Sequence, residues 1–378
     1  MPPRPHAKSR DYAIIDADIH PSVNPERMPD FLPEPWKSRY RSGSRGAGVL
    51  GYWNPAGVVR ADAVTLDGDR IAMDPVLLGT HLFDDYDLEY GILNFEGAIH
   101  AGVGPEPDYS AAVISAINDV AAHDWLPADP RFRASLNVAP NDPLLAAREI
   151  HRLGDHPGFV QVMMGSGARI PYGQRFYHPI YEAAVAHDLP VAIHPGNEGV
   201  GITGPTSAVG YATSYLEWHT GLVASYIGHL VSLITEGVFQ KFPTLRFVMV
   251  EGGVSWLPPV MWRLDKNWKG LRQTVPWLER PPSAYIQEHI RLTTQPIEEP
   301  ENPAHLKQML EMFDAGRMLM FSTDYPHWDG DTPSFSARPF GKDLRARVMG
   351  ETARELYRLP AGPAARSAAV REEVAADD

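Results

Sequence analysis

The stretch that decides the fold is Ile14-Ile15-Asp16-Ala17-Asp18-Ile19-His20-Pro21. It begins as an apolar, β-branched run that is too short for a helix, so we predict a buried strand here. Because side chains alternate along a strand, Asp18 and His20 are expected on the same face. A carboxylate oxygen beside an imidazole nitrogen at a strand end is half of a metal site. The alternative is an ordinary strand end that Asp18 caps and Pro21 stops.

Further along the chain, strand-like and helix-like segments alternate. Seven more strands are predicted, at 89–95, 133–139, 158–163, 189–194, 246–251, 289–293 and 318–322. A helical pattern follows each of them, and runs such as Phe247-Val248-Met249-Val250 are wholly apolar, as in parallel strands buried on both faces. This alternation predicts an α/β fold, a (β/α)8 TIM barrel. A doubly wound open sheet is the alternative, but no Gly-x-Gly-x-x-Gly motif follows an early strand.

The chain is predicted to form one barrel domain over residues 11–358. Residues 1–10 are expected to be a flexible N-terminal tail, and residues 359–378 a C-terminal tail. Residues 21–85 are rich in proline, glycine and charge, and we interpret them as a long insertion after the first strand, over the mouth of the active site. A separate small domain is the alternative for this segment.

Composition restricts the classes of partner and of metal site. The net charge of −13 argues against nucleic acid or an anionic membrane as a partner. The chain contains no cysteine, so a metal must be held by histidines and carboxylates. Residues 1–10 lack the apolar core of a secretory signal, and no apolar run is long enough to span a bilayer. We therefore expect a cytoplasmic protein.

Metal-binding residue types stand at the carboxyl ends of four predicted strands, where the active site of such a barrel lies. They are Asp18 and His20, His194, Glu251, and Asp324. Two histidines and three carboxylates without a thiolate suit Zn²⁺, Mn²⁺ or Fe²⁺. We predict that these five residues hold one divalent ion, with zinc expected and manganese, iron or a second ion as alternatives.

The sequence resembles the amidohydrolase superfamily, in the branch that includes aminocarboxymuconate-semialdehyde decarboxylase and related aromatic-acid decarboxylases. The resemblance extends from Ile14 to about Arg358. Its markers are Ile15-Asp16-Ala17-Asp18-Ile19-His20, Ala192-Ile193-His194-Pro195-Gly196, Gly237-Val238-Phe239-Gln240-Lys241-Phe242-Pro243 and Phe321-Ser322-Thr323-Asp324-Tyr325-Pro326-His327. The resemblance implies a barrel, homo-oligomerisation, and Asp18, His20, His194 and Asp324 as metal ligands.

Two positions depart from this family pattern. Asp18 stands where a histidine is usual, which makes the site more anionic. Glu251 stands where these decarboxylases place a catalytic histidine, and a carboxylate beside a cation suits water activation better than protonation of a ring carbon. Glu251 is therefore a candidate metal ligand or general base. The alternative is a buried structural acid paired with Arg246 or Arg263.

Other candidate residues lie near these strand ends. His219 and His229 flank a predicted helix after the fifth strand, and either could face the site, His219 toward the substrate and His229 as a catalytic residue. The alternative for both is a surface or core histidine. His327 and Trp328, shortly after Asp324, are predicted to line the substrate pocket, and an arginine such as Arg169 or Arg175 is predicted to bind the substrate.

These observations lead to a metal-dependent hydrolase as the main hypothesis. Its metal would activate a water, and Asp324 or Glu251 would take the proton. The substrate is expected to be a small carboxylate, an aromatic compound or a ring-cleavage product. The alternative on the same scaffold is nonoxidative, metal-dependent decarboxylation of an aromatic or muconate-type acid. A third possibility is a binding module that has lost its metal, against which His20, His194 and Asp324 argue.

Overall fold

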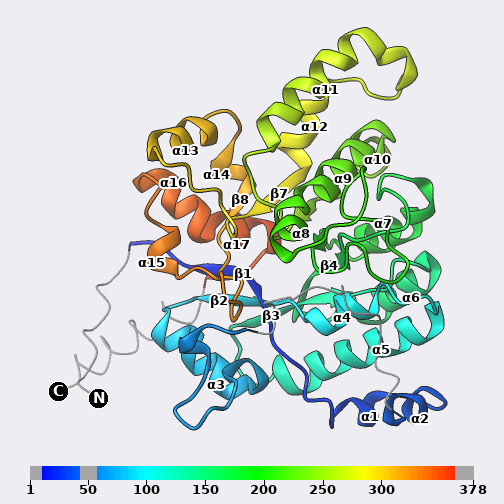
Figure 1. Ribbon diagram of the computed structural model, residues 1–378, viewed down its shortest axis with the longest axis vertical. Coiled ribbons are helices and arrows are strands. Elements are labelled where there is room, and N and C mark those ends of the chain that lie inside the picture. Colours follow the sequence, from blue (N-terminus) through cyan, green and yellow to red (C-terminus); the bar gives the residue numbers. More distant parts are fainter. Residues whose placement is uncertain (1–10, 43–57, 362–378) are drawn as a thin grey trace.

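The computed structural model describes residues 11–42 and 58–361 (Figure 1). Eight strands form one sheet in the order of the sequence, and each pairs in parallel with the next. The strands are β1 (Ile15–Ile19), β2 (Tyr90–Leu93), β3 (Phe132–Asn137), β4 (Phe159–Gly165), β5 (Val191–His194), β6 (Phe247–Met249), β7 (Ile290–Thr293) and β8 (Leu319–Met320). The predicted TIM barrel is confirmed.

The barrel closes where its first strand meets its last. The backbone N–H of Ala17 donates to the carbonyl of Phe321 at 2.9 Å, and that of Asp324 donates to the carbonyl of Asp18 at 3.1 Å. β8 is shorter than the predicted 318–322 because the N–H of Phe321 leaves the strand ladder and bonds to Val348 at 2.8 Å.

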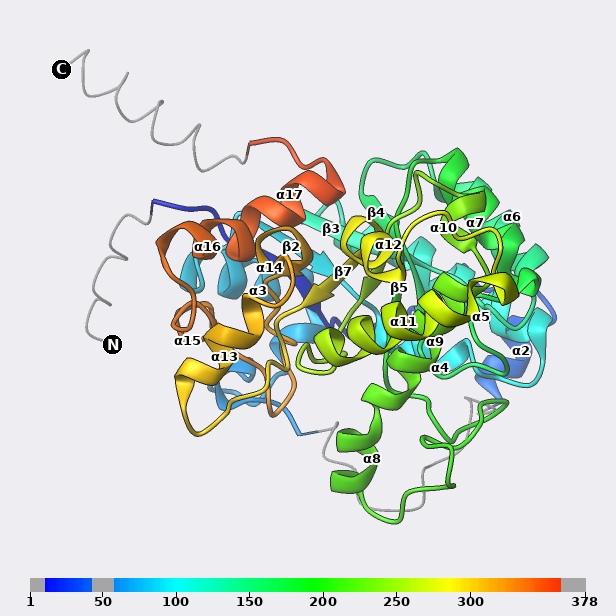
Figure 2. The ribbon, with the colours of Figure 1, turned by 90° about the horizontal axis from the view of Figure 1, so that it is seen from above.

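Helices surround the barrel and connect its strands (Figures 1 and 2). Those after β2 are α4 (Glu96–Ala101), α5 (Pro107–Val120), α6 (Pro143–Leu153), α7 (His178–Ala186), α8 (Tyr215–Gly221), α9 (Val223–Thr235), α10 (Val238–Lys241), α11 (Leu257–Leu271), α12 (Pro282–His289), α13 (Pro303–Leu310), α14 (Ala315–Met318), α15 (Pro333–Ser336), α16 (Lys342–Ala346) and α17 (Thr352–Tyr357). Short 3-10 turns lie at Arg175–Tyr177 and Arg272–Thr274, and π turns at Ala121–Trp125 and Arg347–Glu351. No helix among the described residues is both long and apolar enough to cross a bilayer.

Local sequence explains where these helices begin. α6 starts at Pro143, and the preceding Asp142 accepts hydrogen bonds from the N–H groups of Leu144 and Leu145, both at 3.0 Å. Proline fits the first helical position because that position needs no N–H donor, and aspartate is a preferred N-cap. The predicted start of this helix at residues 141–143 agrees with the structure.

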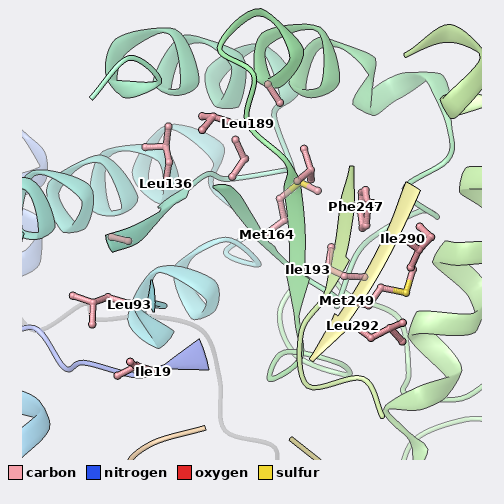
Figure 3. Close-up of a cluster of buried hydrophobic side chains, with 14 of the residues drawn as sticks. Ile19, Leu93, Leu136, Met164, Leu189, Ile193, Phe247, Met249, Ile290 and Leu292 are labelled. Carbon is pink, nitrogen blue, oxygen red and sulfur yellow. The ribbon is translucent and has the colours of Figure 1, made fainter. Parts of the chain in front are cut away.

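Alternating strand residues build two apolar layers. Phe247 and Met249 pack outward with helix residues in a large cluster, part of which Figure 3 shows. Val248 and Ala192 belong to a second, smaller cluster formed mainly by strand residues, which is the barrel interior. Because His194 lies two residues after Ala192, its side chain shares this interior face. The strand pattern thus delivers polar strand-end side chains to the barrel axis.

The insertion after β1 is partly helical. Its described elements are α1 (Met28–Phe31), α2 (Trp36–Arg41), α3 (Pro75–Gly79), 3-10 turns at Ala61–Ala63 and Ile71–Met73, and a π turn at Thr80–Asp85. Val59 forms an isolated bridge with His327, and the N–H of Arg60 donates to Pro326 at 3.0 Å. Part of the insertion therefore touches the turn after β8. Residues 43–57 lie outside the described residues, so the role of the whole insertion stays a prediction.

The predicted tail 1–10 lies outside the described residues, as does the predicted C-terminal tail beyond residue 361. The apolar sequence at 256–259 is compatible either with a surface for homo-oligomerisation or with the core. Trp256, Leu257 and Pro258 are buried, and only Pro259 is exposed, so most of this stretch is core.

Candidate metal centre

The barrel brings five side chains from four strand ends into one buried cluster. Asp18, His20, His194, Glu251 and Asp324 each offer a ligand atom, and these atoms all lie within 4.8 Å of one another. His20 Nε2 is 3.1 Å from Asp18 Oδ1 and 3.0 Å from Asp324 Oδ1. His194 Nε2 is 3.0 Å from Glu251 Oε2 and 3.5 Å from Asp18 Oδ2. The structure thus joins all five residues predicted as metal ligands.

Hydrogen bonds behind the cluster orient its two imidazoles. His20 Nδ1 lies 2.9 Å from the carbonyl oxygen of Asn94, and His194 Nδ1 lies 2.8 Å from that of Pro195. A carbonyl oxygen only accepts, so each Nδ1 carries the proton and each Nε2 lone pair is free in the neutral ring. The two Nε2 atoms lie 3.2 Å apart. Outer hydrogen bonds of this kind typically fix the tautomer of metal-binding histidines.

The donor set fits a divalent cation. Asp18 Oδ1 accepts a hydrogen bond from Asn94 Nδ2 at 2.7 Å, whereas Asp18 Oδ2 is buried without a hydrogen-bond partner. A buried carboxylate oxygen left unpaired costs free energy, and a cation at the facing imidazole nitrogens would satisfy it. Three carboxylates and two imidazoles without sulfur suit a metal of the manganese, iron or zinc type. The cluster is therefore a buried Asp/His/Glu metal site.

Protonation of the cluster follows from its charges. Burial lowers the pKa of His20, but the carboxylates of Asp18 and Asp324 together outweigh burial and raise that pKa to about 9. Burial raises the pKa of Glu251, and repulsion from Asp324 raises it further. Without a cation, protons thus compensate the clustered negative charge. A metal ion would displace them, so metal binding should release protons.

Two of the carboxylates sit on unusual backbone. Glu251 has φ 58° and Asp324 has φ 56°, in the left-handed region that glycine favours. Such conformations cost roughly 1–2 kcal/mol in non-glycine residues. The N–H of Glu251 is held by Thr293 Oγ1 at 2.8 Å. Strained backbone of this kind gathers at functional sites because the surrounding fold enforces it.

Two residues outside the predicted site, Asp16 and Asn94, support the ligands. Asp16 accepts hydrogen bonds from Thr323 N at 3.0 Å, from Thr323 Oγ1 at 2.5 Å and from Asp18 N at 3.0 Å, which links β1 to the β8 end. Burial raises the pKa of Asp16 to about 7. Asn94, just after β2, bonds to Asp18. Asn94 lies near the carboxyl end of the strand predicted at 89–95, and this position was the signal that could have identified it.

His327 contacts the cluster directly. Its Nδ1 donates to Asp324 Oδ1 at 2.7 Å, and its ring stacks on that of His20 with centroids 4.6 Å apart. His327 is also one of the residues predicted to line the substrate pocket. The structure adds that His327 also holds Asp324, a candidate ligand, in place.

Aromatic and charged residues lie at the outer edge of the cluster. His219, on α8, has Nε2 3.9 Å from Glu251 Oε1 and 3.6 Å from Asp329 Oδ2. Tyr215 stacks on His219 with ring centroids 5.4 Å apart. The ring centroid of the half-exposed Trp328 lies 6.4 Å from that of His219. Two predicted substrate-binding residues, His219 and Trp328, are thus neighbours here. Asp329 was not singled out, although it follows Trp328 directly.

Two predicted site residues lie elsewhere. His229 Nε2 donates to the carbonyl of Ser166 at 2.7 Å, and its Nδ1 accepts from Tyr172 N at 3.1 Å. Both ring nitrogens are occupied by backbone, so His229 is a buried structural histidine, and we correct its expected catalytic role. Arg169 is exposed beside Tyr177 and forms no ion pair with the cluster among the described residues. The structure does not bring it to the metal centre.

The structural alternative for Glu251 is not observed. Its carboxylate pairs with His194 in the cluster. Arg246 instead donates to the carbonyls of Thr244 and Leu245, at the opposite end of β6. No described arginine neutralises Glu251, so its charge is available to the metal centre.

Known proteins resemble this chain over most of its length. The amidohydrolase family model matches residues 15–359. A γ-resorcylate decarboxylase of Polaromonas sp. is 26% identical over an alignment of 298 residues, and the match covers 74% of this chain and 86% of that protein.

Two similar solved structures are decarboxylases. One is a 2,6-dihydroxybenzoate decarboxylase from Rhizobium, with a TM-score of 0.65 and 19% identity, covering 92% of this chain and 99% of that one. The other is a 5-carboxyvanillate decarboxylase from Novosphingobium aromaticivorans, complexed with manganese and 4-hydroxy-3-methoxy-5-nitrobenzoic acid. It has a TM-score of 0.68 and 20% identity, covering 92% of this chain and 97% of that one. The family match over almost the whole chain and the clustered strand-end ligands agree: this chain belongs to the amidohydrolase family.

Proposed function

We propose that the protein is a metal-dependent decarboxylase that releases carbon dioxide, without an oxidant, from an aromatic acid carrying a phenolic hydroxyl. The observation that carries this proposal is the buried Asp/His/Glu cluster with aromatic side chains at its edge. The decarboxylase relatives support the reaction class. Their support favours decarboxylation over the hydrolase expected from the sequence.

Asp18, His20, His194 and Asp324 would hold the ion. We propose manganese rather than the expected zinc because the two carboxylates of this set suit Mn²⁺, and because the Novosphingobium relative is complexed with manganese. A bound divalent ion would supply positive charge that binds the oxygens of the acid and stabilises negative charge developing on the ring. Zinc remains the competing choice.

The chain's own residues would position the ring and hold the proton. In decarboxylation the bond between ring and carboxylate breaks, its electron pair stays on the ring carbon, and a proton replaces the carboxylate there. Asp324 Oδ1 and His327 Nδ1 share a proton across 2.7 Å beside the ligands, and we propose this pair as the proton donor. Tyr215 and Trp328 offer flat surfaces for an aromatic ring.

Hydrolysis stays a second candidate because of one residue. Glu251 places a carboxylate, with a pKa raised by burial, where it could accept a proton from water. An ester, lactone or amide of a small aromatic acid would then be the substrate. The two reactions differ in the atoms that solvent supplies to the product.

Isotope labelling tests the proposal. The manganese-loaded protein is incubated with a panel of hydroxybenzoates in deuterated water, and with aromatic esters and lactones in ¹⁸O-water. We expect carbon dioxide and a phenol carrying one deuterium at the former carboxylate position. Asp324→Asn should lower kcat by about 10²-fold or more, whereas Asp331→Asn in the same loop should retain activity. If the acid released from an ester or lactone carries oxygen-18, and no hydroxybenzoate releases carbon dioxide, the protein is the hydrolase instead.

A further inference from the structure

A row of buried polar side chains crosses the mainly apolar interior of the barrel and ends at Asp18. The hydroxyl oxygen of Tyr357 lies 2.9 Å from Gln161 Oε1, and Gln161 Nε2 lies 2.9 Å from Ser135 Oγ. Ser135 Oγ lies 2.5 Å from Asn94 Oδ1, and Asn94 Nδ2 lies 2.7 Å from Asp18 Oδ1. No more than 4% of any of these residues is exposed. These five residues form a polar line that connects α17 to a candidate metal ligand through four consecutive hydrogen bonds.

The direction of every hydrogen bond in the polar line follows from its metal end. The Asp18 carboxylate only accepts, so the Asn94 amide nitrogen must face it and the Asn94 amide oxygen must face Ser135. Ser135 donates its single proton to that oxygen, and its own oxygen then accepts from the Gln161 amide nitrogen. The Gln161 oxygen accepts from Tyr357, and burial raises the pKa of Tyr357, so that its hydroxyl keeps the proton it donates. All four donors therefore point toward Asp18.

The polar line begins at the end of the barrel that lies away from the metal centre. Tyr357, the last residue of α17, belongs to the interior cluster together with Ile15 and Val160, near the starts of β1 and β4. α17 lies on the opposite side of the strands from α8, which carries His219 beside the metal centre (Figure 2). None of the five clustered ligand residues belongs to α17. The polar line therefore joins the metal centre to a helix at the far end of the barrel.

The polar line ends on the residue that orients both ligands of β1. The Asn94 side chain donates to Asp18 Oδ1, and the Asn94 carbonyl oxygen lies 2.9 Å from His20 Nδ1. Because Oδ1 is held in this way, Asp18 Oδ2 is left without a hydrogen-bond partner, 3.5 Å from His194 Nε2. Hydrogen bonds in series polarise one another, so donors far from the carboxylate strengthen the last bond. Apolar side chains would fill the same space without the cost of burying amides and hydroxyls.

We propose that Tyr357, Gln161 and Ser135 are positioning residues for the metal, which act through Asn94 to present Asp18 Oδ2 to the ion. The helix α17 thus sets the affinity of a centre to which it contributes no ligand. This inference concerns metal binding alone, so it is independent of the reaction that the centre performs.

The metal affinity of the full chain tests this proposal. Protein stripped with a chelator is titrated with Mn²⁺ and, separately, with Zn²⁺ by calorimetry, and denaturant unfolding measures the stability of the metal-free protein. Loss of an outer hydrogen-bond partner typically weakens metal binding by roughly 10- to 100-fold, so we expect Ser135→Ala to raise Kd about tenfold. Tyr357→Phe should raise Kd about threefold, because polarisation along the line weakens with each bond. Tyr181→Phe is the matched control, since it also removes a buried tyrosine hydroxyl, which donates to the carbonyl of Tyr172 at 2.6 Å. It should lose stability but keep the wild-type Kd.

A double variant distinguishes a connected line from separate contributions. If Tyr357 acts through Ser135, Ser135→Ala/Tyr357→Phe should raise Kd no further than Ser135→Ala alone, whereas independent effects multiply. A Tyr357→Phe protein with the wild-type Kd, or a double variant whose effects multiply, would overturn the proposal. An equal rise in Kd for Tyr181→Phe would overturn it as well, because the effect would then follow general stability. Binding is measured without substrate, so a failure to release carbon dioxide rejects the decarboxylase alone, and unchanged Kd values reject this inference alone.

Discussion

Asp18 is the residue on which the metal centre most depends. It lies beside both imidazoles, and Asn94 donates a hydrogen bond to only one of its oxygens, while the other is buried without a hydrogen-bond partner. Because water cannot hydrate this oxygen, the native protein without a cation retains an unsatisfied group. A bound cation should therefore stabilise the fold and not only serve the chemistry.

Removing the Asp18 carboxylate should reduce the gain in free energy of unfolding that metal binding gives. At a manganese concentration 100 times Kd, the wild type should gain about 2.7 kcal/mol in the free energy of unfolding. Asp18→Asn should lose most of that gain, since it removes a charged ligand oxygen. Denaturant unfolding with manganese and with a chelator measures both. Asp119→Asn, on the surface, should keep the full gain, and an equal gain in Asp18→Asn would contradict the assignment.

The sequence predicts some site residues better than others for a physical reason. Asp18, His20, His194, Glu251 and Asp324 lie at or just after the ends of predicted strands, and parallel strands in a barrel end at one rim. Side chains on helices carry no such constraint, since their direction depends on where the helix starts and how it packs. His229 was therefore misplaced in the expected site. Contacts between distant segments, such as that between Asp16 and Thr323, have no local signal.

At the scale of elements, His229 fastens α9 to the segment after β4. Its two ring nitrogens bond to the backbone of Ser166 and Tyr172. This arrangement requires a neutral ring, with Nε2 protonated and Nδ1 accepting. Burial lowers the pKa of His229 to about 4. The helix is thus attached by a group whose protonation would break the attachment.

This attachment should make stability depend on pH. The pKa of an unfolded histidine is about 6.5, so the unfolded chain binds the proton more tightly than the folded one. The stabilisation is complete above about pH 6.5 and is lost as pH falls toward 4, by up to about 3 kcal/mol. His229→Gln should be less stable at pH 7 but lose less on acidification, as measured by denaturant unfolding. His123→Gln, at an exposed position, should follow the wild-type pH profile; a His229→Gln profile equally steep would contradict the assignment.

Arg60 ties the insertion to the turn after β8. Its backbone N–H donates to Pro326 at 3.0 Å, its guanidinium donates to the carbonyl of Gly330, and its Nε bonds to Asp62 at 3.0 Å. The turn between Pro326 and Gly330 carries Trp328 and Asp329. The insertion therefore has a direct connection to the proposed substrate pocket.

Arg60→Ala should loosen this turn without emptying the metal site. We expect kcat/KM to fall about tenfold, which corresponds to a loss of about 1.4 kcal/mol of transition-state stabilisation, and the tightly bound metal to remain. Steady-state kinetics and elemental analysis measure the two quantities. Arg41→Ala, at the end of α2 in the same insertion, is the matched control and should retain activity. Loss of the metal in Arg60→Ala would show a general structural role instead.

At the scale of the whole molecule, the barrel was predictable because its information is local. Each strand is a short apolar run and each helix has its own pattern, so the eightfold alternation appears without knowledge of contacts. Assembly into oligomers is different, since it depends on which surfaces stay uncovered. Trp262 and Leu271 on α11, and Trp277 after it, are exposed. Homo-oligomerisation stays a prediction, which the molar mass from light scattering checks.

Closure of the barrel between β1 and β8 has a consequence for biosynthesis. Asp18 and His20 leave the ribosome early, but Asp324 is added about 300 residues later. At about 5–20 residues per second, this interval is roughly 15 s to a minute. During that time the nascent chain exposes ligands with no completed centre around them. The metal can therefore be bound by the complete set of ligands only after Asp324 has been synthesised. A stalled or truncated product that lacks Asp324 cannot retain the ion as the full-length protein does.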